Sequence, residues 1–195
     1  MYKTIENSYD SFKEVRIKER AFSYELWLKL INEWGKSPML TVSEIGKTYE
    51  GKPIHEIKFG VGPIHVCAWS QMHGDEATAT MALADIFLFL SKKGDKFDKI
   101  REILHQKITL FVIPRLNADG AERWTRETAL GIDMNRDAIK LYSPEAKILH
   151  HWAHQIKPLF SFNLHDQHRL YSVGITSHQT HIALLATTGD DQGTW

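Results

Sequence analysis

Cysteine is almost absent from this chain of 195 residues, which contains one, Cys67. A single cysteine cannot form an intramolecular disulfide, so a scaffold held together by disulfides is excluded. Net charge is absent as well, because 24 basic residues balance 24 acidic residues. A chain without an excess of positive charge has no broad field that attracts nucleic acid or anionic lipid, and we expect neither as a partner.

Long apolar runs and flexible linkers are also missing. The most apolar stretch, residues 81–90, contains Asp85 and falls far short of the roughly 20 residues of a membrane span. Residues 1–10 are polar, whereas a secretory signal needs a basic start followed by an apolar run of about 7–15 residues. These features favour a cytoplasmic protein without membrane association. No segment rich in glycine, serine or proline divides the chain.

Apolar periodicity predicts strands that alternate with helices. We expect strands at residues 41–47, 53–58, 64–69, 108–113 and 159–164. We expect helices at residues 22–34, 76–91, 97–106 and 144–155, and a short helix or an arm within residues 1–20. The alternation favours an α/β fold of three layers, α/β/α, with a mixed and mostly parallel central sheet.

Two predicted strand ends carry residues that are typical of a metal site. His73 and Glu76 follow the strand at 64–69, three positions apart at the entry to a helix, and His165 follows the strand at 159–164. Ligands gather at the carboxyl ends of strands in open α/β sheets. A catalytic zinc is held by three such protein ligands and keeps one position open for water. The sequence therefore predicts a metal site; manganese or cobalt would suit the same ligands.

The segment between these strand ends shows a resemblance to a known family. It contains Asn117-Ala118-Asp119-Gly120, then Arg123 and Arg126, then Asp133-Met134-Asn135-Arg136. In this order the motifs resemble those of the zinc metallocarboxypeptidases, the carboxypeptidase A-like peptidases, with Ala118 in place of the usual proline. The resemblance covers residues 41–174. It implies that His73, Glu76 and His165 bind Zn²⁺.

The same resemblance implies roles for residues that contact the substrate. Arg126 would stabilise the oxyanion beside the scissile carbonyl, with Arg123 as the rival by position. Asn135 and Arg136 would hold the free C-terminal carboxylate of a peptide substrate. A guanidinium suits this task because it binds a carboxylate through two parallel hydrogen bonds. Asp166 either supports a ligand histidine or caps a turn.

The chain also departs from the family pattern. The family uses a glutamate as general base after the second zinc histidine, but no glutamate follows Glu145 here. The specificity tyrosine has no counterpart, and residues 175–195 do not resemble the family. We therefore expect a metallocarboxypeptidase-like domain at 1–174, an aberrant or truncated tail at 175–195, and a sheet that is incomplete at its C-terminal end. Peptidase activity is expected to be weak or absent, and an exposed strand edge would favour a homo-oligomer.

Two other functions remain open at this stage. One is deacylation of N-acyl amino acids, as in the aspartoacylase and succinylglutamate desuccinylase relatives, which share the metal pair and the Asn-Arg pair. The other is a non-catalytic domain that binds peptide ends. Among the remaining candidates, His150, His151 and His154 are expected on an exposed or half-buried helix face, although the first and last are one turn apart and close enough to share a metal. Cys67 is expected to be a small buried hydrophobe.

Overall fold

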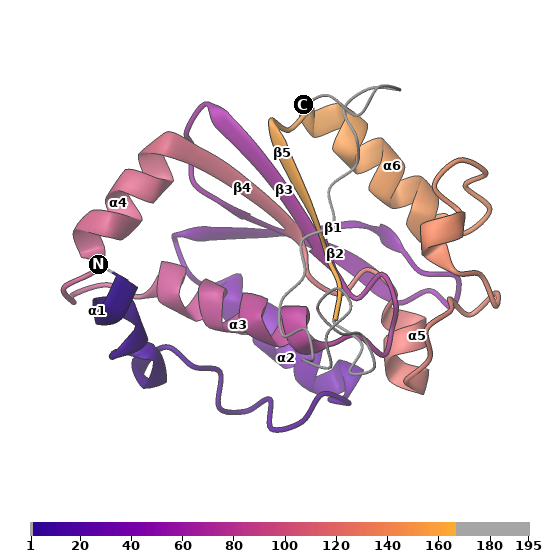
Figure 1. Cartoon of the computed structure of the whole chain (residues 1–195), viewed down its shortest axis with the longest axis horizontal. Coiled ribbons are helices and arrows are strands. Elements are labelled where there is room, and N and C mark those ends of the chain that lie inside the picture. Colours follow the sequence, from indigo (N-terminus) through magenta and orange to yellow (C-terminus); the bar gives the residue numbers. More distant parts are fainter. Residues whose placement is uncertain (1, 167–195) are drawn as a thin grey trace, which may run out of the picture. The chain divides into compact units, whose positions relative to one another are not determined.

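Five strands form one open sheet in the order β1-β2-β4-β3-β5 (Figure 1). The computed structural model describes residues 2–166. The strands are β1 (Leu40–Lys47), β2 (Pro53–Phe59), β3 (Ile64–Ser70), β4 (Ile108–Ile113) and β5 (Phe160–Leu164). The β1–β2 and β2–β4 pairs are antiparallel, and the β3–β4 and β3–β5 pairs are parallel. The predicted mixed sheet is confirmed, with two of its four pairings parallel.

Helices cover both faces of this sheet. The α-helices are α1 (Tyr2–Glu6), α2 (Tyr24–Trp34), α3 (Thr78–Ser91), α4 (Asp98–Lys107), α5 (Ala118–Arg123) and α6 (Pro144–Ile156). Two short 3₁₀ helices are η1 (Tyr9–Ser11) and η2 (Met134–Arg136). Serine side chains begin two of the longer helices: Ser23 accepts a hydrogen bond from the N–H of Leu26, and Ser143 accepts one from Ala146.

Two apolar clusters, one on each side of the sheet, confirm the three-layer arrangement. The first joins α2 and α3 to the strands and includes Trp34 and Phe87. The second joins α6 to the other face and includes Ile113 and Trp152. Figure 1 shows α2 and α3 together on one side of the sheet and α6 on the other. Cys67 is fully buried in the second cluster, as expected for a small hydrophobic residue.

The N-terminal segment is fastened to α3 by one carboxylate. The hydroxyl of Tyr9 donates to Oδ2 of Asp85 at 2.5 Å, and the backbone N–H of Glu14 donates to Oδ1 at 2.6 Å. The hydrogen bond to Asp85 raises the pKa of Tyr9 to about 12. Asp85, which interrupts the most apolar stretch of the sequence, is therefore an anchor for the segment that precedes α2.

The observed elements differ from the predicted ones mainly between residues 114 and 136. The motif Asn117–Gly120, where no helix was predicted, begins helix α5, because the side chain of Asn117 accepts a hydrogen bond from the N–H of Gly120 at 2.9 Å and caps the helix. In residues 2–166 no helix combines the length and the apolar character needed to cross a membrane. The predicted tail at 175–195 lies outside the described residues.

Candidate metal centre

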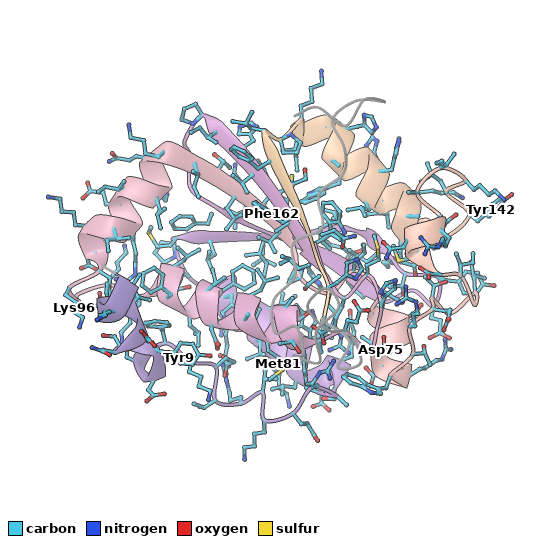
Figure 2. The ribbon with its side chains drawn as sticks, in the orientation of Figure 1. Tyr9, Asp75, Met81, Lys96, Tyr142 and Phe162 are labelled. Atoms are coloured by element: carbon cyan, nitrogen blue, oxygen red, sulfur yellow. The ribbon has the colours of Figure 1, made fainter. Side chains whose placement is uncertain are left out.

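The loop after β3 carries two of the predicted ligands on a tightly constrained backbone. Gln71 adopts a left-handed conformation with a φ of 47°, and its side-chain amide donates to the carbonyl of Gly74 at 2.8 Å. At Gly74 an added Cβ would lie 2.0 Å from the carbonyl carbon of Gly120, so only glycine allows this approach of the loop to α5. Figure 2 shows Asp75 of this loop beside α5. The bend sends His73 and Glu76 toward the same point.

Three side chains from two distant segments converge there. Nδ1 of His73 lies 2.8 Å from Oε1 of Glu76, and Nδ1 of His165, 89 positions further along the chain than Glu76, lies 2.6 Å from Oε2. The two imidazole rings are 4.8 Å apart between centroids. One potential ligand atom from each residue lies within 4.8 Å of the others. Two imidazole nitrogens and a carboxylate are a donor set that zinc accepts, so the residues fit the ion.

Burial and hydrogen bonding favour the charged forms of this cluster. His73 is 1% exposed, Glu76 is half-buried and His165 is exposed, so the site opens on the side of His165. Burial acts to raise the pKa of Glu76, but hydrogen bonds from His165 and His73 outweigh it and lower the pKa to about 2. Burial acts to lower the pKa of His73, yet the hydrogen bond and the charge of Glu76, together with the hydrogen bond of Asp133, keep that pKa above the usual value. Glu76 is therefore an anion that attracts a cation.

Arg126 and Asp133 lie directly beside the cluster. Nη1 of Arg126 is 3.1 Å from Nδ1 of His73 and 3.4 Å from Oε1 of Glu76. Nε and Nη2 of Arg126 donate to Oδ2 of Asp133, and Oδ1 of Asp133 lies 3.2 Å from Nε2 of His73. Contact with Nε2 leaves Nδ1 of His73 directed at Glu76. Arg126 thus reaches the predicted metal ligands, whereas Arg123 pairs with Glu50 on the surface.

Of the two predicted carboxylate anchors, Asn135 lies at the open side of the same site and Arg136 follows it in the chain. The amide nitrogen of Asn135 is 3.3 Å from Nε2 of His73 and 3.4 Å from Nε2 of His165. Arg136 is exposed at the end of η2, and within residues 2–166 its guanidinium has no hydrogen bond or ion pair. An unpaired guanidinium is free to bind an added carboxylate. Asp166 is half-buried, and its role stays a prediction.

Asn117 ties together the two segments that form the site. This fully buried side chain donates from Nδ2 to the carbonyl of Met72 at 3.4 Å and to the carbonyl of Glu127 at 3.1 Å. Met72 precedes the ligand His73, and Glu127 follows Arg126. In the sequence, Asn117 and Asp133 stand out only as members of motifs. The burial of Asn117 is seen in the structure alone, and the motif that contains Asp133 does not predict its contact with His73.

The open α/β sheet carries a His-Glu-His cluster at two strand ends, so the fold and the cluster are those of an α/β protein with a possible metal site. Comparison with known families identifies the class of protein. The model described as "Zinc carboxypeptidase" matches residues 24–158, which is more than half of the chain, and the chain belongs to this family. The matched segment includes His73, Glu76 and Arg126 and ends before His165.

Individual relatives agree with this assignment. "Carboxypeptidase SOL1" of Arabidopsis thaliana is 26% identical over an alignment of 137 residues, and the match covers 62% of this chain and 28% of that protein. A metallo-carboxypeptidase from Burkholderia cenocepacia has a TM-score of 0.69 at 23% identity. The match covers 75% of this chain and 41% of the Burkholderia chain. One from Pseudomonas aeruginosa, solved with (2-guanidinoethylmercapto)succinic acid, has a TM-score of 0.65 at 20% identity, with 75% and 40% covered. The chain spans less than half of each relative, and the two structures establish the fold alone.

Proposed function

We propose that this chain is a zinc-dependent hydrolase of the carboxypeptidase type that recognises the C-terminal end of a peptide. The observation that carries the proposal is the convergence of His73, Glu76 and His165 beside the guanidinium of Arg126. Zinc held by the three ligands would polarise the scissile carbonyl and lower the pKa of a water toward about 7. The family match supports this ion, and elemental analysis of the wild type and His73→Ala tests it.

Arg126 and Asp133 supply positive charge in a fixed place. Asp133 accepts two hydrogen bonds from Arg126, so the guanidinium stays beside the metal ligands whether or not a substrate is present. We assign Arg126 to the developing oxyanion of the substrate, where a donor fixed in place is worth about 3 kcal/mol of barrier. Its Nη1 now contacts donor atoms of His73 and Glu76, and metal binding requires that this contact shift.

Asn135 and Arg136 are assigned to the substrate carboxylate. The exposed, unpaired guanidinium of Arg136 and the inward amide of Asn135 lie at consecutive positions on η2, so one carboxylate can contact both. Calorimetry of a zinc-loaded sample with a short peptide and its C-terminal amide tests the assignment. We expect the free acid to bind more tightly and Arg136→Ala to remove the difference. Equal affinity of the wild type for both peptides would rule it out.

The rate of turnover is a separate matter from binding. Residues 146–195 of the given sequence contain no glutamate that could act as general base. We therefore expect peptide-end binding with weak or absent peptidase activity. Turnover of a blocked dipeptide at the rate of an intact carboxypeptidase would contradict this expectation. Turnover of an N-acyl amino acid in place of the peptide would instead favour the deacylase function.

We also propose self-association through strand β5. In residues 2–166 this strand pairs with β3 alone, and its side chains Phe160 and Phe162 are 54% and 49% exposed. Figure 2 shows Phe162 on this strand. An exposed apolar edge strand favours pairing with another chain. Light scattering over a range of concentrations tests this, and a constant monomer mass would count against it.

A further inference from the structure

Helix α6 carries a second group of imidazoles, far along the chain from His73 and on a face that the proposed reaction does not use. The rings of His150 and His154 lie 4.2 Å apart between centroids, at an interplanar angle of 47°. Residues four positions apart lie on the same face of a helix, one turn from each other. Both side chains are exposed to solvent. A metal ion can therefore approach both rings without disturbing the core.

The opposite face of α6 holds the helix in place. Trp152 is 5% exposed, and its indole Nε1 donates to Oε2 of Glu56 on β2 at 2.5 Å. Pro144 and the cap from Ser143 fix the first turn, and Ala146 packs in the core. The backbone beneath the two histidines is therefore rigid. Two ligands on a rigid backbone lose little conformational freedom when they bind one ion.

We propose that His150 and His154 form a second metal site, which takes a borderline divalent transition metal such as Cu²⁺, Ni²⁺ or Zn²⁺. Neutral imidazole is a preferred ligand of these ions, and affinity within the series rises to Cu²⁺. His154 lies in the last turn of α6, where the helix dipole favours a positive charge. The site is independent of the proposed function, since it shares no residue with the His73 centre.

The surroundings of the pair determine which ions it accepts. Lys147 precedes His150 by three positions, and Lys157 follows His154 by three. Two lysines and no carboxylate at these positions disfavour Ca²⁺ and Mg²⁺, which need oxygen ligands. With two protein ligands the ion completes its shell with water, so it binds more weakly and exchanges faster than an ion held by three.

His151 provides a matched control on the same helix. It is exposed like its neighbours and lies three positions before His154, yet the ring contact joins His154 to His150. Three variants of the chain, each loaded with zinc, are compared with the wild type: His150→Ala, His154→Ala and His151→Ala. All three positions are exposed, and circular dichroism checks that each variant remains folded.

Equilibrium dialysis against Ni²⁺ gives the decisive measurement. We expect the His150→Ala and His154→Ala variants each to lose about one equivalent of bound Ni²⁺ relative to the wild type, and His151→Ala to lose none. Retention of the untagged proteins on immobilised Ni²⁺ should fall in the same two variants. The proposal is overturned if both variants bind as much Ni²⁺ as the wild type, or if His151→Ala loses as much as they do.

Discussion

Asp133 connects Arg126 to His73 through its two carboxylate oxygens. Oδ2 accepts hydrogen bonds from Nε and Nη2 of Arg126 at 3.1 and 3.0 Å, while Oδ1 lies 3.2 Å from Nε2 of His73. One side chain therefore orients both a metal ligand and the proposed oxyanion donor. Burial acts to raise the pKa of Asp133, but its hydrogen bonds with Arg126, the N–H of Asn135 and His73 together outweigh this and hold the pKa below its usual value.

Replacing Asp133 should weaken the metal site without unfolding the protein. Asp133→Asn removes the carboxylate that favours one orientation of the His73 ring. We therefore expect metal affinity to fall by about 10- to 100-fold. Competition with a chelator of known affinity measures the change. Asp10→Asn, an exposed position on η1, is the control and should leave the affinity unchanged. An unaltered affinity in Asp133→Asn would show that this carboxylate does not support His73.

Arg126→Ala should separate metal binding from turnover. Nη1 of Arg126 contacts the atoms of His73 and Glu76 that would face a metal ion, so its removal should leave metal affinity unchanged or raise it. Any peptidase activity should fall about 100-fold or more, because the oxyanion loses its donor. Arg123→Ala is the control, since Arg123 pairs with Glu50 and not with the site. Lower metal affinity in Arg126→Ala would contradict the assignment of Arg126 to turnover and not to metal binding.

The position of Gly74 predicts a third effect. A Cβ at residue 74 would lie 2.0 Å from the carbonyl carbon of Gly120 and 2.2 Å from the nitrogen of Ala121, so the loop must move away from α5. We expect Gly74→Ala to cost about 1–3 kcal/mol of unfolding free energy and to displace His73, with loss of metal affinity. Gly35→Ala is the control, because its Cβ would have no neighbour closer than 3.4 Å. Chemical denaturation and metal titration of both variants measure the two effects.

Much of the fold and the metal ligands follows from local sequence signals. The strand preceding His73 and the strand preceding His165 are short apolar runs, and in an open α/β sheet such strands end on one side. Since β3 and β5 pair in parallel, with Ser70 opposite Leu164, the two ligand segments leave the sheet together. The sequence therefore predicts that both histidines follow strand ends on one side of the sheet, and the structure adds that the two strands are neighbours.

Other parts depend on contacts between distant residues and could not be predicted. Asp133 reaches His73, 60 positions away, because the loop after α5 folds back over the site, and no local pattern encodes that path. Asn117 contributes to the fold of that loop by bonding the carbonyls of Met72 and Glu127. The attachment of the N-terminal segment to Asp85 is likewise a long-range contact.

Arg115 offers a test of stability away from the metal centre. The residue is 3% exposed, its Nε and Nη2 have no hydrogen-bond partner within residues 2–166, and burial lowers its pKa to about 10. Its Cζ lies 4.9 Å from the ring centroid of Phe22 and 5.7 Å from that of Tyr24. Methionine keeps the apolar stem of the side chain and removes a buried charge, so Arg115→Met should be neutral or stabilising by about 1–4 kcal/mol.

Arg115→Ala is the matched comparison. It removes the same charge but also the packing against Phe22, and it should destabilise the protein by about 2–4 kcal/mol. Urea denaturation of both variants separates packing from charge. Equal destabilisation in the two variants would indicate that the guanidinium itself, through its 3.8 Å approach to Glu122, holds the N-terminal segment in place.

Glu145 predicts a dependence of stability on pH. The residue is fully buried, its Oε1 accepts from the N–H of Tyr49 at 2.9 Å, and its Oε2 has no partner in the described part of the chain. Burial raises the pKa of Glu145, with a further contribution from the charges of Asp119 and Asp137. The folded protein therefore holds this proton more tightly than the unfolded chain does.

The sign of the effect follows from this difference in proton binding. At a pH below the ordinary glutamate pKa of about 4.3, both states are protonated and the stabilising contribution is complete. As the pH rises, the unfolded chain releases the proton first, and the contribution of Glu145 to stability falls until the pH passes the folded-state pKa. Glu145→Gln keeps an oxygen for Tyr49 and cannot ionise. Its unfolding free energy relative to the wild type, measured in urea at a series of pH values, should therefore rise across this window, and a constant difference would contradict the raised pKa.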